Sequence, residues 1–131
     1  MRDLGYGTSL VGKWHLGNSP EHGPLRHGYE RFFGILGAGA DCFTHEFRVP
    51  PTGKSDLRDG EVPVTRDGCL PDILATRAIE DIAHFADSAR PFFISLHFTA
   101  PHWPWEGPED RHYTDDVGSA GVKSTGLAER Y

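Results

Sequence analysis

Residues 70–99 have the sequence LPDILATRAIEDIAHFADSARPFFISLHFT and contain the two elements that decide the fold. Over residues 70–89, apolar residues recur at intervals of three and four, as on the buried face of an amphipathic helix, while polar residues such as Asp81 lie elsewhere on the wheel. Residues 92–99 are almost continuously apolar and β-prone, which is typical of a strand buried on both faces of a parallel sheet. A helix followed directly by such a strand indicates an α/β fold.

Two further strands are predicted before the helix. Residues 6–11 favour extended backbone, and we expect Gly12 to end that strand. Residues 29–36, YERFFGIL, could form another strand or be partly irregular. A strand as apolar as 92–98 needs helices on both faces of its sheet, and the sequence contains one whole helix. We therefore expect residues 1–131 to be the central fragment of a larger domain, an incomplete layered sandwich with a mostly parallel sheet.

The remaining segments are turns and loops. Residues 2–5 look like the last turn of a helix that ends on Gly5, because glycine suits the left-handed position after a helix. Residues 37–69 show no clear periodicity, apart from a hairpin turn predicted at Asp59-Gly60. A loop of that length is unusual inside a compact domain unless it has a function.

The composition excludes several classes of protein. With 37% hydrophobic and 24% charged residues, the chain is typical of globular domains. Its net charge of −6 leaves no basic patch for nucleic acid or an anionic membrane surface. No apolar run approaches the roughly 20 residues of a membrane span, and the first residues, MRDLG, contain no signal-peptide core. Two cysteines, Cys42 and Cys69, could be free thiols or form one bridge.

Lys13 and His15 follow the first predicted strand and are the first candidates for chemistry. In extended backbone they point to the same side and Trp14 points to the other. Ligands of open α/β sheets bind at the carboxyl ends of strands, so this pair could bind an anion and transfer a proton. Alternatively, Lys13 is a surface residue and His15 packs against Trp14.

His102 follows the strand at residues 92–98 in the same way, next to Pro101, which stiffens the loop. It could be a catalytic group held in place by that loop, or it could pack in an aromatic corner. Because two separate strand ends each present a histidine, we expect a shared cleft.

The other polar residues give weaker signals. The histidine and cysteine spacings match no standard zinc pattern, so we expect no dedicated zinc site. We expect Asp41, Glu46 and Asp59 to be solvated in loops. The remaining histidines are expected to be structural or exposed: His22, His27, His45, His84, His97 and His112.

Four collinear segments resemble the type I sulfatases. Residues 5–17, GYGTSLVGKWHLG, are similar to the second signature segment of that family. Residues 24–34, PLRHGYERFFG, the helix from Leu70, and residues 91–104, PFFISLHFTAPHWP, follow in the family's order. The resemblance extends through about Tyr113. It implies an alkaline-phosphatase-like α/β fold and an enzyme that hydrolyses sulfate esters, including those of sulfated glycans.

The resemblance also implies roles for the three candidate catalytic residues. Family members use a formylglycine hydrate, made from Cys or Ser in a C/S-x-P-S/A-R motif, beside a divalent cation that is usually calcium. By position, Lys13 would bind the oxygens of the sulfate and the formylglycine. His15 would act as base on the formylglycine hydroxyl, and His102 would contact the sulfate and help to protonate the leaving alcohol.

The sequence departs from the family pattern at the nucleophile and at the metal ligands. Cys69-Leu70-Pro71 imitates the first half of the formylglycine motif, but Asp72 and Ile73 replace its small residue and arginine, and its place in the chain order is wrong. The family's acidic pair and its later Asp-Asn segment with a downstream lysine are also missing. We therefore expect neither the formylglycine precursor nor the calcium ligands in this chain, and no sulfatase activity from the chain alone. By analogy the whole enzyme would be periplasmic or secreted.

Two other functions remain open. Lysine and histidine suit any tetrahedral oxyanion, so a phosphate mono- or diester hydrolase of the same superfamily is one alternative. A non-catalytic module that binds sulfated glycans through Lys13, His15 and His102 is the other.

Overall fold

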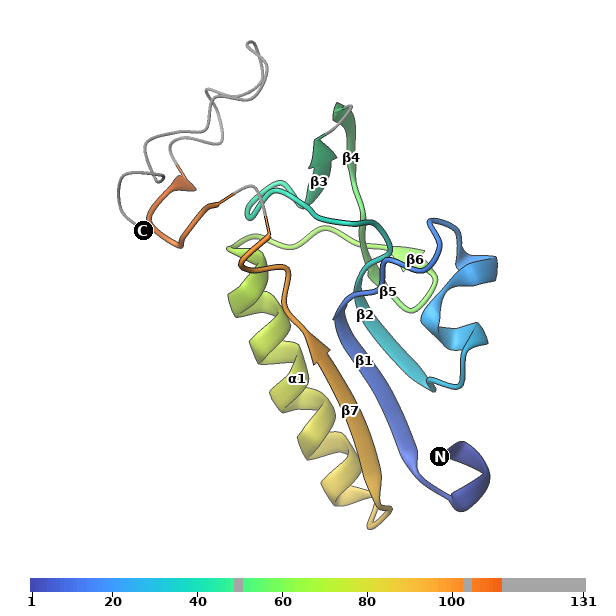
Figure 1. The fold of residues 1–131 in the computed structure, drawn as a ribbon. Coiled ribbons are helices and arrows are strands. Elements are labelled where there is room, and N and C mark those ends of the chain that lie inside the picture. The colour runs from blue at the N-terminus through green and yellow to red at the C-terminus, as the bar shows by residue number, and fades with distance from the viewer. Residues whose placement is uncertain (49–50, 103–104, 112–131) are drawn as a thin grey trace.

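The computed structural model describes residues 1–48, 51–102 and 105–111 (Figure 1). Its main element is a five-stranded sheet in the order β6-β5-β2-β1-β7, and a separate two-stranded sheet pairs β3 with β4. The strands are β1 (Gly7–Lys13), β2 (Arg31–Ile35), β3 (Glu46–Arg48), β4 (Pro51–Ser55), β5 (Leu57–Asp59), β6 (Val62–Pro63) and β7 (Phe92–His97). The helical elements are α1 (Leu70–Asp87) and the short 3-10 turns η1 (Arg2–Leu4), η2 (Pro20–His22) and η3 (Pro24–Arg26).

The sheet is mixed. β1 runs parallel to β2 on one side and to β7 on the other. β5 and β6 extend the sheet in antiparallel fashion beyond β2, with the predicted turn at Asp59-Gly60 between them. The predicted α/β class and the second strand within residues 29–36 are therefore confirmed.

Alternation along the strands produces a core on each face of the sheet. Val11 and Phe33 point toward α1 and join a buried cluster with Leu70 and Leu74. Leu10, one residue earlier on β1, belongs to the opposite cluster, in which the segment carrying η2 and η3 packs on the sheet. Successive side chains of a strand face opposite sides, so β1 contributes to both cores.

The helix forms where the periodicity predicts it, and it ends at Asp87, two residues earlier than expected. Ala89 has a φ of 53°, outside the helical region. The prediction for Asp81 is wrong: this side chain is completely buried. It accepts hydrogen bonds from Ser9 on β1, Arg31 on β2 and Arg77 one turn earlier, and so connects the helix to the sheet.

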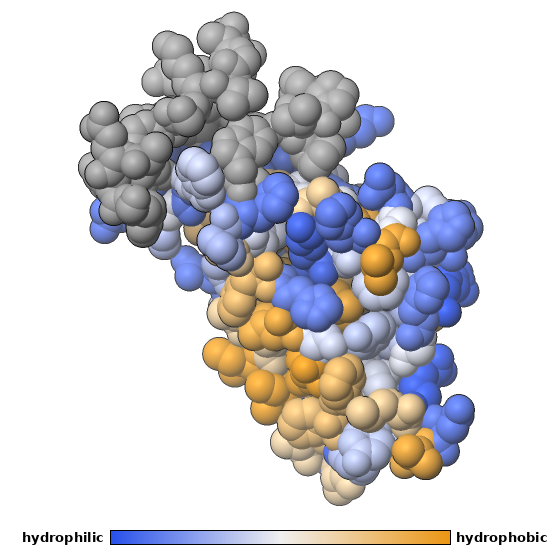
Figure 2. Space-filling model, viewed as in Figure 1, coloured by the Kyte–Doolittle hydropathy of each residue, from blue (hydrophilic) through white to orange (hydrophobic). Residues whose placement is uncertain are grey.

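The strand at residues 92–98 forms as β7, but the prediction that it is buried on both faces is wrong for the described part of the chain. β7 is the edge of the sheet there, and Phe92, Phe93, Leu96 and Phe98 are each about two fifths exposed. Figure 2 shows hydrophobic side chains gathered on the side of the molecule where β7 and α1 lie. This edge therefore exposes a set of large apolar side chains.

Three smaller predictions have clear outcomes. Gly5 adopts the left-handed conformation after η1, as expected, with a φ of 81°. Gly12 does not end the first strand, because it pairs with both neighbours inside β1. The aperiodic stretch 37–69 contains strands β3 to β6.

No helix within residues 1–48, 51–102 and 105–111 is long and apolar enough to cross a membrane.

Candidate active site

The three predicted site residues follow adjacent parallel strands. Lys13 is the last residue of β1, and His15 comes two residues later. His102 comes five residues after the end of β7, and its backbone N–H donates to the oxygen of Thr99 at 2.9 Å. Because Gly12 is paired with His97, β1 and β7 end at the same edge of the sheet. That edge is the one at which open α/β sheets bind ligands.

Two glycines allow the strands to come together tightly just before Lys13. A Cβ atom added to Gly12 would lie 1.9 Å from the backbone oxygen of His97. A Cβ added to Gly34, its partner on β2, would lie 1.9 Å from the oxygen of Gly12. Both glycines have positive φ, 124° and 154°, which other residues rarely adopt. Glycine at positions 12 and 34 therefore allows the close approach of three adjacent strands where the candidate site begins.

The backbone of His15 is not extended, although the position of this residue just after a strand predicts that it is. Its φ is 63°, in the left-handed region, although its N–H still continues the β1–β2 pairing by donating to the oxygen of Leu36 at 3.0 Å. The prediction that Lys13 and His15 point to the same side depends on extended backbone at both residues, and this condition is not met at His15. Non-glycine residues in this region are uncommon and cluster at functional sites.

Trp14 lies on the side of the sheet covered by η2 and η3. Its indole Nε1 donates to the oxygen of His22 at 2.8 Å, and its ring contacts those of His27 and Tyr29. The alternative in which His15 packs against Trp14 is not what the structure contains, since the exposed His15 instead lines a cavity.

That cavity has a volume of about 660 Å³. Besides His15, its lining includes Lys54 at the end of β4, Asp56, and Arg58 on β5. Sequence reasoning missed these residues because they lie in the stretch without periodicity, some 40 residues beyond the histidine in the chain. The only available signal was the hairpin turn at Asp59-Gly60, which predicts that this segment returns to the sheet.

His97 is a further residue near the candidate site, which the sequence predicts only to be structural or exposed. It ends β7, and its ring Nδ1 lies 3.1 Å from the backbone oxygen of Lys13. The bond requires the tautomer with a proton on Nδ1, which then donates to the carbonyl. His97 therefore connects the two strands that carry Lys13 and His102.

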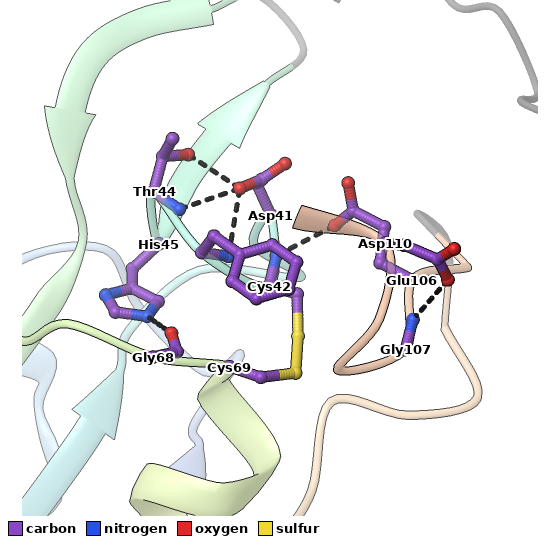
Figure 3. The surroundings of a disulfide bond; sticks show 10 residues. Asp41, Cys42, Thr44, His45, Gly68, Cys69, Glu106, Gly107 and Asp110 are labelled. Atoms are coloured by element: carbon purple, nitrogen blue, oxygen red, sulfur yellow. Dashed lines mark hydrogen bonds between the residues drawn. A yellow bond between two sulfur atoms is a disulfide. The ribbon is translucent and has the colours of Figure 1, made fainter. Parts of the chain in front are cut away.

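The loop after β2 is held by a disulfide and a buried carboxylate (Figure 3). Cys42 and Cys69, left open by the sequence, are bonded with their Cα atoms 4.9 Å apart, and Cys69 is the N-cap of α1. The prediction that Asp41 is solvated is wrong, since it is completely buried. Its Oδ1 accepts hydrogen bonds from the N–H groups of Phe43 and Thr44. Burial would raise the pKa of Asp41, but these bonds outweigh it and lower the pKa.

The described residues do not fit the metal and the nucleophile that the resemblance implies. No group of three or more His, Cys, Asp or Glu side chains comes together in the described ranges in a way that could hold a metal ion. Both cysteines are consumed by the disulfide, so Cys69 is not available as a formylglycine precursor. The candidate residues Lys13, His15 and His102 can supply positive charge and proton transfer.

Comparison with known proteins identifies the family. The family model described as Sulfatase matches residues 1–124. The chain belongs to the sulfatase family. An arylsulfatase of Klebsiella aerogenes is 30% identical over 116 residues, which cover 84% of this chain and 24% of that protein.

Two solved structures share the fold of this chain. Ps i-CgsB in complex with k-i-k-neocarrahexaose gives a TM-score of 0.70 at 24% identity, covering 88% of this chain and 29% of that one. BT4656, in complex with its substrate D-glucosamine-2-N,6-O-disulfate, gives a TM-score of 0.61 at 24% identity, covering 97% of this chain and 22% of that one. The chain spans about a fifth to a quarter of the curated relatives it matches. The predicted family, fold class and membership of an enzyme family are confirmed.

Proposed function

We propose that residues 1–131 are the central part of a sulfatase catalytic domain that hydrolyses sulfate esters, with Lys13, His15 and His102 at the site. The observation that carries this proposal is the convergence of the three residues on one edge of the sheet, at the ends of the adjacent parallel strands β1 and β7. A lysine and two histidines at one edge of the sheet can supply positive charge and proton transfer, two of the contributions that cleavage of a sulfate ester needs.

Each residue would act according to its chemistry. The Lys13 ammonium would stabilise the negative charge on the sulfate oxygens, and preorganised donors of this kind are often the largest contributors to catalysis. His102 would contact the sulfate and help to protonate the departing alcohol oxygen, and His15 would act as a general base once the alcohol has left. The formylglycine and the divalent cation, usually calcium, that the resemblance implies would come from chain outside residues 1–131. The 131 residues alone would then be inactive.

The proposed substrate class is a sulfated carbohydrate. The neighbouring structure of BT4656 contains a sugar with two sulfate groups as its substrate, which supports this choice. The alternative of a phosphate ester hydrolase rests on the same Lys13 and histidines, because their charge suits any tetrahedral oxyanion. The second alternative, a module that only binds sulfated glycans, keeps the same residues without turnover.

A comparison of leaving-group-matched substrates tests the proposal. We expect the full-length protein to hydrolyse nitrophenyl sulfate with a higher kcat/KM than nitrophenyl phosphate. Lys13→Ala should lower the rate by about 10²–10³-fold, whereas Arg66→Ala, which removes an exposed cation, should not change it. Faster hydrolysis of the phosphate would favour the phosphate ester hydrolase. Binding of sulfated glycans without hydrolysis of either ester would favour the binding module.

A further inference from the structure

The cavity beside His15 continues directly from the proposed catalytic edge. The N–H of His15 donates to the oxygen of Leu36, and the next two residues, Gly37 and Ala38, line the cavity. The N–H of Gly37 in turn donates to Oδ2 of Asp56 at 2.7 Å, which ties this wall to the turn between β4 and β5. A molecule held at Lys13 and His15 therefore has the cavity as its immediate neighbour.

The charged lining of the cavity is mainly cationic, on a chain whose net charge is −6. Lys54 and Arg58 line it together with His15, and Asp56 is the one carboxylate among its described lining residues. Oδ1 of Asp56 lies 3.8 Å from Nε of Arg58, so part of its charge is balanced locally. Burial also raises the pKa of Asp56, since the charged carboxylate is disfavoured away from water. Lys54 and Arg58 thus bring positive charge to this cavity on a chain whose net charge is negative.

Arg58 is held in place before any ligand arrives. Its Nη1 donates to the backbone oxygen of Glu61 at 3.1 Å across the turn between β5 and β6. Its side chain is only 20% exposed, while Lys54, one strand away, is exposed. A guanidinium fixed by its own backbone loses little freedom when it binds a planar or tetrahedral oxyanion.

We propose that this cavity is a second acidic-group subsite, in which Lys54 and Arg58 bind a sulfate or carboxylate on the sugar next to the one whose sulfate ester is cleaved. This inference rests on the proposed function, because it assumes that the scissile sulfate lies at Lys13. The volume of about 660 Å³ lies in the range of small-molecule sites and accommodates a sugar ring. The substrate class is therefore an acidic oligosaccharide with at least two anionic groups, in preference to a simple aryl sulfate.

Binding measurements with three matched disaccharides test the subsite. Each disaccharide carries the same monosulfated ring, and its neighbouring ring bears a second sulfate, a uronate carboxylate or a neutral hydroxymethyl group. Dissociation constants are measured by calorimetry on the full-length protein. The wild type is compared with Lys54→Gln. Lys54→Arg retains the cation, and Arg66→Gln removes an exposed cation just beyond the cavity residue Thr65. Far-UV circular dichroism checks that each variant is folded.

We expect the wild type to bind at least one of the two doubly anionic disaccharides about tenfold or more tightly than the neutral one, as charge-assisted hydrogen bonds allow. Lys54→Gln should reduce that ratio toward one, while Lys54→Arg and Arg66→Gln should retain it. A preference for the second sulfate or for the carboxylate identifies the acidic group. Equal affinities for all three disaccharides in the wild type, or a ratio unchanged by Lys54→Gln, would overturn the inference. Loss of sulfate ester hydrolysis is a separate result, because the binding ratio does not depend on turnover.

Discussion

Nδ1 of His97 lies 3.1 Å from the backbone oxygen of Lys13, so the last side chain of β7 is bonded to the last residue of β1. Lys13 ends the first of these two strands, and His102 of the proposed site lies in the loop that follows the second. The bond lies where Gly12 and Gly34 bring the backbones of β7, β1 and β2 close together. We therefore infer that His97 is a positioning residue for Lys13, acting through the backbone and not through contact with substrate.

Replacing His97 should reduce turnover more than stability. In His97→Ala the Lys13 carbonyl loses an exposed hydrogen bond, whose net contribution is about 0.5–1.5 kcal/mol. In the full-length protein we expect kcat for nitrophenyl sulfate to fall by about three- to tenfold, with little change in KM or melting temperature. His97→Asn, whose amide can donate from a similar position to Nδ1, should recover most of kcat. An equal loss in the alanine and asparagine variants would contradict a positioning role.

The buried carboxylate of Asp81 should be essential to the fold. Asp81→Asn leaves the guanidinium groups of Arg31 and Arg77 without their common anion beneath the sheet. Breaking a buried ion pair in this way costs about 3–5 kcal/mol. The exposed Asp87 on the same helix provides the control, and Asp87→Asn should cost less than about 0.5 kcal/mol. Thermal denaturation of both variants of the full-length protein measures the difference, and similar melting temperatures would show that the network contributes little.

The local elements could be predicted because their signals are local. The 3.6-residue periodicity placed α1, and β-branched and aromatic residues placed β1 and β2. The position of β7 at the edge of the described sheet was not predicted, because the apolar run at residues 92–98 favours a strand covered on both faces. Which strands flank it depends on distant parts of the chain.

The placement of the candidate residues was predicted in outline, while their catalytic roles stay a prediction. Lys13, His15 and His102 could be expected at one edge because strand ends of a parallel sheet share an edge. The left-handed φ of His15 and the position of Arg58 in the cavity lining could not be predicted, since both depend on contacts between distant segments. Likewise, Cys42 and Cys69 are 27 positions apart in the sequence, and this separation does not predict that their Cα atoms lie 4.9 Å apart.

Stability should fall as the pH drops below the usual histidine range, because of His45. Its imidazole is buried and its Nε2 lies 3.1 Å from the oxygen of Gly68. Burial lowers its pKa below the ordinary value of 6.5, so the unfolded chain takes up a proton before the native state does. The stabilisation is fully present above pH 6.5 and is lost as the pH falls toward the native pKa.

We expect the free energy of unfolding to decrease by up to about 1.4 kcal/mol per pH unit below pH 6.5 through this group. His45→Gln keeps a donor toward Gly68 and should flatten that part of the profile. The exposed His84 on α1 serves as the control, and His84→Gln should leave the slope intact. Urea denaturation of the full-length protein between pH 7.5 and pH 5 gives the profiles, and parallel curves for the wild type and His45→Gln would refute this cause.

Residues 1–131 expressed alone should be poorly soluble or molten. The edge strand β7 exposes Phe92, Phe93, Leu96 and Phe98, and α1 exposes Ile79 and Ile82. Unpaired edges and apolar patches of this kind favour aggregation. We expect strong binding of anilinonaphthalene sulfonate and no sharp melting transition. A soluble monomer with one cooperative transition would show that these surfaces need no further cover.

The role of His102 as a proton donor can be tested in the full-length protein with substrates that differ in their leaving group. A nitrophenolate departs as a stable anion and needs little help from an acid, whereas an alkyl or sugar alkoxide must be protonated as it leaves. If His102 donates that proton, His102→Ala should lower kcat/KM by about 10²–10⁴-fold for alkyl and sugar sulfates and much less for nitrophenyl sulfate. Lys13→Ala should instead slow all of these substrates alike, because it stabilises charge on the sulfate itself. Equal losses for good and poor leaving groups in His102→Ala would mean that this histidine only maintains the shape of the site.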